Sequence, residues 1–561
     1  MSLNSGIDSR LRSMLLSDPE RSTRALLGVG LILLFAASLV GSEFHPATLL
    51  NSQSLQSGAD FFATFWPPRT DTEFLQRLMR ATIVTVSIAT VATVLAIVLA
   101  APLAVMVTSR LSISSRGRSM SPVSRICRGT LRGLLLFMRS VPELIWALLF
   151  VGITGLGATA GIMGLLITNV GILAKNYAEI MESGEASITG NLLDNGSSRT
   201  QTLFYATVPE CLPELLSYSI YRWECTLRTS VVLGFVGAGG LGQELLISIR
   251  QLSSPEVLSI ILVFVVLVYL ADTLSGSLRR YLHRHNRQES HISLLSGKRS
   301  LLLQRISMAA LVLLVLSSFH AVDWQVGQWL KPSSFARTKE FVFGFLPPDT
   351  SLGLWQRLAT GALETLSMAF AGTALACIVA LLISYALFVA DQRKQAVGRS
   401  LLIVFIRGVQ IVLRSIPELV WAMLLIIVAG IGPFTGTLAL FLASVGVLSR
   451  LYSECLENQD AAALENLLAN GSRPIIAPLW STLIQARSQL LSYSLYRWEH
   501  NLRAATLMGI VGAGGVGQEL YLRLSVFQFD KVAACILVIV LMVALADSIS
   551  HFLRHRYAPT V

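Results

Sequence analysis

Two apolar, helix-length runs of the chain carry the same ionisable residues in the same order. They extend from Leu215 to Leu245 and from Leu490 to Leu520, at a constant offset of 275 residues. The charged residues are Arg222, Glu224 and Arg228 in the first run and Arg497, Glu499 and Arg503 in the second. An ionisable group at membrane depth costs about 3 kcal/mol, so groups placed there twice point to a function. We expect them to line a solute pathway.

The spacing of these charges indicates which of them is free to bind a solute. Glu224 precedes Arg228 by four residues, the favourable order for an ion pair within one helix. Glu499 and Arg503 repeat this order, whereas Arg222 and Arg497 lie roughly 160° away around the helix and lack that partner. Each repeat should therefore keep one uncompensated guanidinium. A guanidinium offers a planar fork of donors that matches phosphate or carboxylate, so an oxyanion is the expected cargo. Alternatively, Arg222 bonds a carboxylate such as Glu143 and only holds helices together.

A second motif places a proline inside an apolar run between basic and acidic residues. RSVPELIWA, from Arg139 to Ala147, returns as RSIPELVWA from Arg414 to Ala422. The prolines at its fourth position should kink or interrupt a membrane helix, which is tolerated where neighbours satisfy the freed carbonyls. The charges beside the bends, Arg139 and Glu143 with their copies Arg414 and Glu418, belong either to a gate or to a static kink.

The elements that position these charges are membrane helices. The chain is 53% hydrophobic and 14% charged, with a mean hydropathy of +0.63, whereas soluble domains carry about a quarter charged residues. These values predict an all-α polytopic membrane protein. The net charge of +11 lies mostly in short loops between apolar runs, which is a topology signal and argues against nucleic-acid binding.

About twelve transmembrane helices are expected, six in each of two tandem repeats, residues 1–290 and 291–561. An even number of spans per repeat makes the repeats parallel, related by an axis along the membrane normal. A pathway at the interface between them follows. The expected apolar runs are residues 25–40, 81–107, 134–153, 158–174, 215–236 and 257–274, then 307–322, 361–390, 401–428, 434–448, 490–511 and 532–545.

The basic loops predict the orientation in the plasma (inner) membrane. Positive charge gathers between the second and third runs, in the linker between the repeats and at the C-terminus, so these segments and both termini should be cytoplasmic. The residues concerned are Arg110, Arg116, Arg118, Arg125, Arg128 and Arg132, then Arg279, Arg280, Arg284, Arg287, Lys298 and Arg299 against Glu289, and finally Arg554 and Arg556.

The sequence contains no recognisable catalytic, metal or cofactor motif. Gly237 to Gly242 and Gly512 to Gly517 satisfy GxGxxG, but each follows a membrane run and lacks the strand that a dinucleotide site requires. We expect these glycines to end a helix and to allow close packing. The six cysteines form no CxxC pair, and no Walker A motif is present. The chain should therefore not be an enzyme and should hold no metal or cofactor.

Two loop motifs resemble a known family. NLLDNG ends at Gly196 and precedes Pro209, and ENLLANG runs from Glu465 to Gly471. They are similar to the signature of ABC importer permeases, EAA followed by three residues and a glycine, with a later LP. The first copy has Gly190 in place of the Glu, and the second has Ile484 in place of the Pro. With the RSxPELxWA, YRWE and VGAGGxGQEL motifs, the chain looks like a fused pair of phosphonate-type permeases.

That resemblance implies a type I (MetI-like) importer fold and transport of phosphonate or a related phosphorus oxyanion. It also implies two separate ATP-binding cassette subunits, which use the ATP, and an extracytoplasmic phosphonate-type solute-binding protein. The ATPases would dock on the coupling loops, at Leu192, Asn195, Gly196, Glu465, Asn470 and Gly471. Two alternatives remain open: a gradient-driven secondary anion carrier or channel, and a sensor subunit that transports nothing.

Overall fold

The computed structural model describes residues 21–47, 52–108, 122–183, 186–288, 311–322, 339, 343–391 and 397–557. Within these residues the regular elements are all helical. Several expectations fall elsewhere: the repeat boundary after residue 290, and the basic residues Arg110, Arg116, Arg118, Lys298 and Arg299 together with Glu289, lie outside the described residues.

The first repeat contains thirteen described helical elements. They are α2 (Arg21–Gly41), α4 (Ser52–Ala63), α5 (Thr72–Val107), α6 (Pro122–Ser140), α7 (Glu143–Thr154), α8 (Ala158–Ser183), α9 (Ala186–Asp194), α10 (Arg199–Thr202), the π-helical η2 (Leu203–Thr207), α11 (Val208–Leu233), the 3-10 turn η3 (Gly234–Val236), α12 (Gly240–Arg250) and α13 (Ser254–Gln288).

The second repeat follows the same order where it is described. It begins with an apolar helix, Leu311–Ala321. There follow α17 (Leu352–Asp391), α18 (Val397–Ser415), α19 (Glu418–Ala429), α20 (Pro433–Glu457), α21 (Ala462–Ala469), α22 (Ala477–Trp480), α23 (Thr482–Met508), the 3-10 turn η4 (Gly509–Val511), α24 (Gly515–Ser525) and α25 (Phe529–Tyr557).

Where they are described, the twelve expected apolar runs fall on helices or on broken helices; residues 307–310 of the seventh run lie outside the described residues. Among the described residues, six helices are long and apolar enough to cross a membrane, or up to nine if each of three bent pairs is one span. The breaks between α6 and α7 and between α18 and α19 bend the chain by 87° and 97°. The prediction that Pro142 and Pro417 interrupt the third run of each repeat is confirmed.

The two repeats are interlocked rather than side by side. The last helix of each repeat packs on the third of the other, α13 on α18 and α25 on α6, and α2 packs on α17. One buried apolar cluster contains residues of both repeats, because Val420 and Leu424 of α19 join Ile260 and Phe264 of α13. Burial of such side chains contributes about 2 kcal/mol each in water; within a bilayer, close packing takes over that role.

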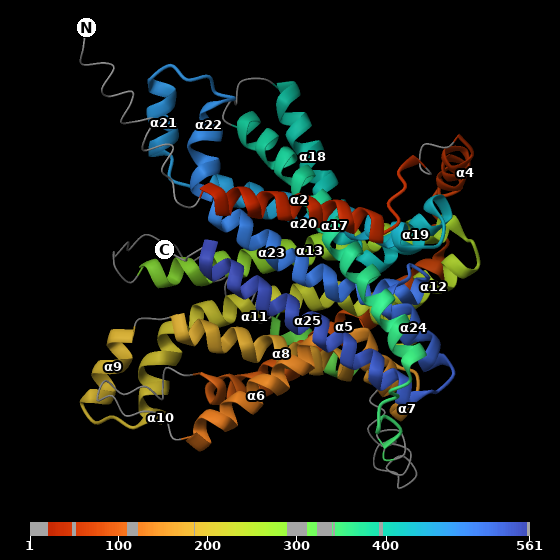
Figure 1. Cartoon of the computed structure of the whole chain (residues 1–561), viewed down its shortest axis with the longest axis horizontal. Coiled ribbons are helices and arrows are strands. Elements are labelled where there is room, and N and C mark those ends of the chain that lie inside the picture. The colour runs from red at the N-terminus through yellow and green to blue at the C-terminus, as the bar shows by residue number, and fades with distance from the viewer. Residues whose placement is uncertain are drawn as a thin grey trace.

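The loop helices and the short helices that follow the proline breaks and glycine clusters lie at opposite ends of the bundle. In Figure 1, α9 and α10 lie at the same end as α21 and α22, where α25 also ends. The short helices α7, α12, α19 and α24 lie at the other end. Equivalent elements of the two repeats thus point the same way, as parallel repeats require.

Candidate functional site

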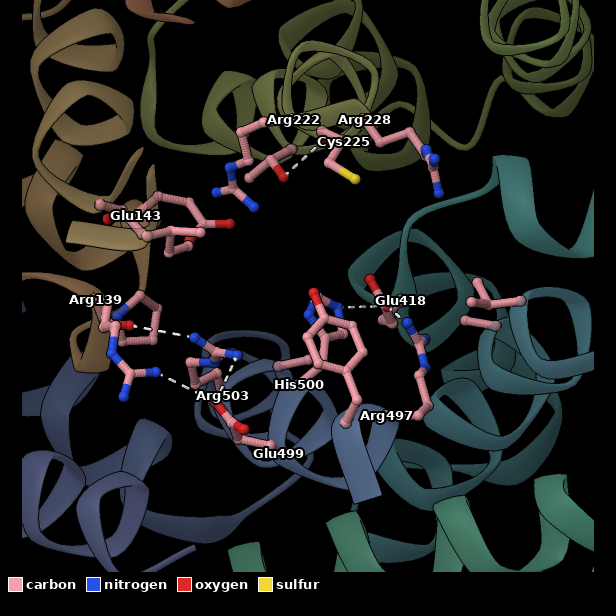
Figure 2. A pocket seen from close by; sticks show the side chains of 18 of the residues that line it. Arg139, Glu143, Arg222, Cys225, Arg228, Glu418, Arg497, Glu499, His500 and Arg503 are labelled. Carbon is pink, nitrogen blue, oxygen red and sulfur yellow. Dashed lines mark hydrogen bonds and ion pairs between the residues drawn. The ribbon is translucent and has the colours of Figure 1, made fainter. Parts of the chain in front are cut away.

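A cavity of about 350 Å³ lies between the two repeats. Figure 2 shows side chains of α11 on one side of it and side chains of α23 on the other. Its charged lining consists of eight basic and four acidic residues: Arg139, Lys175, Arg222, Arg228, Arg414, Arg497, Arg503 and Arg554, against Glu143, Glu179, Glu418 and Glu499. The excess of basic groups favours a negatively charged occupant, since low-dielectric walls strengthen their field.

The glycine clusters fix the ends of the helices that carry the arginines. After α11, Gly237 takes a left-handed conformation with φ of 84° and Gly239 has φ of 90°, so the helix ends and α12 turns back. A Cβ on Gly242 would lie 1.7 Å from the carbonyl oxygen of Val231, so only glycine lets α12 approach α11 this closely. The expectation that these glycines end a helix and permit close packing is confirmed.

The proline breaks present charges to the cavity from two helix ends. Arg139 lies in the last turn of α6, and Pro142 is the N-cap of α7, whose first residue is Glu143. A cation at a helix C-terminus and an acid at an N-terminus both complement the helix dipoles. The second repeat places Arg414 and Glu418 in the same way around Pro417.

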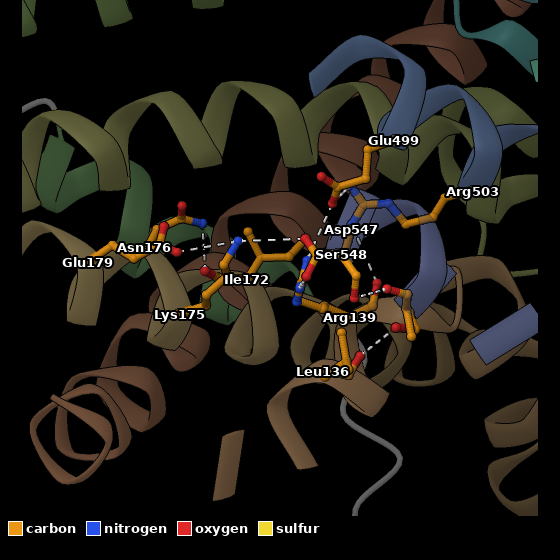
Figure 3. Close-up of polar contacts among 12 residues, drawn as sticks. Leu136, Arg139, Ile172, Lys175, Asn176, Glu179, Glu499, Arg503, Asp547 and Ser548 are labelled. Atoms are coloured by element: carbon orange, nitrogen blue, oxygen red, sulfur yellow. Dashed lines mark hydrogen bonds and ion pairs between the residues drawn. The ribbon is translucent and has the colours of Figure 1, made fainter. Parts of the chain in front are cut away.

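Ion pairs cross between the repeats at these breaks. Arg139 Nη2 of the first repeat lies 2.7 Å from Asp547 Oδ2 of the second, and its Nη1 lies 3.4 Å from Glu499 Oε1 (Figure 3). Arg414 Nη2 of the second repeat lies 2.6 Å from Asp272 Oδ2 of the first. The two crossed pairs are equivalent by the repeat offset, so each repeat holds the broken helix of the other.

The intrahelical pairs expected from the sequence are present. Arg228 Nη2 lies 2.7 Å from Glu224 Oε1, and Arg503 Nη2 lies 3.3 Å from Glu499 Oε1. Glu224 and Glu499 are almost fully buried beneath these arginines. Both pairs therefore place a guanidinium at the cavity next to its counter-charge.

The expectation that each repeat keeps one uncompensated guanidinium is wrong for the second repeat. Arg497 Nη2 lies 2.8 Å from Glu418 Oε1, and His500 Nε2 lies 3.3 Å from the same oxygen. A buried guanidinium without a counter-charge is costly, and here Glu418 of α19 supplies one. The bond to a carboxylate that the structural alternative expects is thus present at Arg497.

Arg222 differs from Arg497. Its Nε donates to Asn169 Oδ1 at 2.7 Å, and within the described part of the chain no carboxylate pairs with it. Glu143, the equivalent of Glu418, likewise has no recorded side-chain partner among the described residues, and both line the cavity. One unpaired cation and one unpaired acid thus remain on the first-repeat side.

Several residues that line the cavity or pair with its arginines escaped the sequence reasoning. Asp272 and Asp547 neutralise the arginines at the breaks, and their recurrence at the 275-residue offset inside apolar helices was the available signal. Tyr221 and Tyr496 also line the cavity. Trp223 packs against a buried apolar cluster instead, and its indole Nε1 donates to Thr90 Oγ1 at 3.1 Å.

The two loop motifs form matching helix ends. After α9, Gly196 has φ of 88°, its N–H donates to Leu193 O, and the N–H of Ser197 donates to Leu192 O. After α21, Gly471 has φ of 82° and the same pair of bonds forms one repeat later. This is a Schellman motif, which requires a residue that tolerates positive φ. In both, the Asn before the glycine, Asn195 or Asn470, donates to a carbonyl four residues earlier, and Glu465 is exposed.

Comparison with known proteins gives a consistent result. A family model described as "Binding-protein-dependent transport system inner membrane component" matches residues 116–288 and 385–559, together more than half of the chain. The "Phosphate-import permease protein PhnE" of Mycolicibacterium smegmatis is 31% identical over 436 residues, which are 76% of this chain and 77% of that protein. The "Phosphite transport system permease protein PtxC" of Stutzerimonas stutzeri is 38% identical over 213 residues, 38% of this chain and 74% of that protein.

A solved structure is also similar to part of the chain. An inward-facing conformation of the MetNI methionine ABC transporter covers 36% of this chain and 99% of that chain, at 20% identity and a TM-score of 0.32.

Proposed function

This chain belongs to the family of binding-protein-dependent transport system inner membrane components and is thus a membrane permease subunit of an ABC importer; from this we propose that its cargo is phosphonate or a related small phosphorus oxyanion. The relatives named for phosphate and phosphite transport support this cargo. The observation that carries the proposal is the cavity between the repeats, which is lined by eight basic and four acidic residues.

The cavity suits a small oxyanion for two further reasons. Five of its basic groups are held in fixed positions by carboxylates, so their donors are already oriented before the anion enters. The acids paired with them also lower the net field, so that an anion is attracted but still leaves. Both properties are needed for transport, because a site that binds too tightly slows release.

The ATPase subunits dock on the coupling loops at α9–α10 and α21–α22. Both loops lie at the same end of the bundle (Figure 1), and both present an exposed aromatic side chain, Tyr205 at 81% exposure and Trp480 at 71%. These two residues are equivalent by the repeat offset. An exposed aromatic side chain on a short helix is suited to insertion into a groove on a partner protein. The partners hydrolyse the ATP, and this chain contributes no ATPase site of its own.

The solute-binding protein docks at the opposite end, where the glycine clusters lead into α12 and α24. This assignment places the coupling loops and both termini in the cytoplasm and the glycine clusters at the outer mouth. The crossed ion pairs at the helix breaks lie between these two ends, beside the cavity.

Reconstituted uptake tests the proposal. The full chain is inserted into liposomes with its ATPase and binding protein, and entry of labelled phosphite, methylphosphonate and phosphate is measured. ATP-dependent entry of at least one of them, without entry of methionine, is the expected result. Entry that continues without the ATPase and follows an ion gradient would instead support a secondary carrier or channel.

A further inference from the structure

The two repeats present different chemistry to the cavity, although they share the Tyr-Arg-Trp-Glu motif. In each, the Nε of the motif arginine is held by the helix that precedes it: Arg222 donates to Asn169 at 2.7 Å and Arg497 to the Ser444 hydroxyl at 2.9 Å. The guanidinium of Arg497 then gives Nη2 to Glu418. Among the described residues no protein acceptor is recorded for the Nη groups of Arg222, which leaves this edge of its fork for a ligand.

The cause of the difference lies one helical turn away. His500 bonds Glu418 and, together with Arg497, fixes that carboxylate from two sides. The first repeat has Cys225 at the equivalent position, and a thiol gives no comparable bond to a carboxylate. Glu143 therefore remains without a recorded partner in the described part of the chain. In the second repeat the motif arginine and the acid after the helix break are thus paired with each other, whereas in the described part of the first repeat they are not.

Other positions of the cavity wall follow the same division. Where the first repeat has side chains with hydroxyl or amide groups, the second has apolar ones. Thr168, Asn176 and Thr229 correspond to Ala443, Leu451 and Ala504, and all six line the cavity. Asn176 donates to the Tyr218 hydroxyl at 2.8 Å, which leaves the Tyr218 O–H free to donate in turn. Hydrogen-bonding groups thus gather on the wall that carries Arg222.

On the basis of the proposed function, we propose that the phosphorus oxyanion binds on the first-repeat wall, with its charged oxygens on Arg222 and its P–OH group donating to Glu143. Phosphate and phosphonate groups exchange their last proton near neutral pH, so a species with both a charged oxygen and a P–OH is available. A carboxylate accepts a hydrogen bond from that OH and repels an anion without one. Sulfate is such an anion, and the site discriminates against it.

This assignment gives the arginines of the motif separate roles. Arg222 contacts the solute through its free edge, as a planar fork does with phosphate oxygens. Arg497 is a positioning residue, because its charge is neutralised by Glu418, which His500 also contacts within the second repeat. Discrimination by a hydrogen bond to a substrate OH is strong, since the analogue that lacks the OH leaves a buried polar group unpaired.

The test exchanges the residues that distinguish the repeats. Cys225→His gives the first repeat the histidine that fixes the acid in the second, and His500→Cys is the matched control. Uptake of labelled methylphosphonate by the complete reconstituted transporter is measured with each, together with basal ATPase activity. We expect Cys225→His to raise KM by about tenfold or more and His500→Cys to change it by less than about twofold.

Two further variants address the pairing itself. Arg222→Gln should lower uptake by on the order of tenfold or more, with partial recovery in Arg222→Lys, which keeps the charge but loses the fork. Glu143→Gln supplies a donor as well as an acceptor, so we expect excess sulfate to compete with methylphosphonate in this variant and not in the unmodified protein. Recovery of the ATPase subunits with each purified variant shows that the complex is assembled.

The outcomes separate this proposal from the one it rests on. If the unmodified transporter carries methylphosphonate while Cys225→His and His500→Cys have equal effects, or if Glu143→Gln still ignores sulfate, the first-repeat site is refuted and the proposed function stands. If the unmodified transporter carries no phosphorus oxyanion in the presence of ATP, both proposals fail.

Discussion

Arg139 and Asp547 are separated by most of the chain, yet Arg139 Nη2 lies 2.7 Å from the Asp547 carboxylate and joins the third helix of one repeat to the last helix of the other. Arg414 and Asp272 form the equivalent contact at 2.6 Å. The pairs stand beside the cavity, at the broken helices that carry Glu143 and Glu418. Any movement of one repeat against the other must therefore act on these contacts.

The two crossed pairs should differ in their contribution to stability. Loss of Asp272 leaves Arg414 without a carboxylate among the described residues, although Arg450 keeps Glu454. Loss of Asp547 leaves Arg139 with Glu499 and Lys175 with Glu179. Removing one partner of a buried pair costs about 3 to 5 kcal/mol. Asp272→Asn should therefore lower the Tm of the purified chain in detergent more than Asp547→Asn. Equal shifts, or a larger one for Asp547→Asn, would contradict the assigned contacts.

Each repeat has a buried polar contact between equivalent helices, but the helix that supplies the asparagine differs between the two repeats. In the first, Asn169 on α8 donates to Thr226 on α11 at 3.1 Å; in the second, Asn501 on α23 donates to Ser444 on α20 at 2.8 Å. All four side chains are buried. We expect Asn169→Ser and Thr226→Asn each to lower the Tm, while the double variant regains part of the loss.

The double-mutant cycle gives the coupling directly. Residues in one hydrogen-bond network couple by about 0.5 to 3 kcal/mol, and here the sign should favour the double variant. Additive effects of the two single variants would show that Asn169 and Thr226 do not form the contact.

Tight helix packing predicts a contrast among glycines. A Cβ at Gly517 would lie 1.8 Å from Thr506 O, and a Cβ at Gly242 would lie 1.7 Å from Val231 O. A Cβ at Gly276 meets nothing within 4 Å. Gly517→Ala and Gly242→Ala should each destabilise the chain by about 1 to 3 kcal/mol or more, because backbone must move. Gly276→Ala serves as the control and should stay near the unmodified Tm. A stable Gly517→Ala protein would rule out the close approach of α24 to α23.

The coupling loops allow a test through backbone conformation alone. Gly196 and Gly471 have φ of 88° and 82°, and a Cβ at either meets nothing within 4 Å. Alanine there costs about 1 to 2 kcal/mol through the left-handed conformation and should deform the loop without a steric clash. Gly190→Ala in α9, where φ is not positive and space is open, is the control.

Co-purification of the ATPase subunits measures the effect. We expect it to fall in Gly196→Ala and Gly471→Ala and to remain in Gly190→Ala. Undiminished ATPase recovery from both glycine variants would argue that the partners dock elsewhere.

Much of this architecture could be predicted from sequence because it is encoded locally. The intrahelical pairs Glu224–Arg228 and Glu499–Arg503 follow from a four-residue spacing, and the breaks at Pro142 and Pro417 follow from the missing N–H and fixed φ of proline. The helix ends at the glycine clusters are local in the same sense.

What could not be predicted depends on contacts between distant helices. Arg222 and Arg497 have similar neighbours in sequence, and the consequence of Cys225 in place of His500 shows only when the distant Glu143 and Glu418 are brought beside them by helix packing. The crossed pairs likewise depend on α25 crossing to α6 and α13 to α18, which a count of apolar runs does not indicate. The roles of the arginines and acids in transport stay predictions.

The central claim, that the cavity between the repeats is the anion pathway, can be tested at Cys225, which lines it. A variant that keeps Cys225 as its single cysteine is treated with a small anionic methanethiosulfonate reagent, with and without methylphosphonate. The control keeps only Cys127, which is exposed on α6 and does not line the cavity. Labelling of Cys225 should abolish ATP-dependent uptake and be slowed by methylphosphonate, while labelling of Cys127 should leave uptake unchanged. Full labelling of Cys225 with uptake intact would contradict the account.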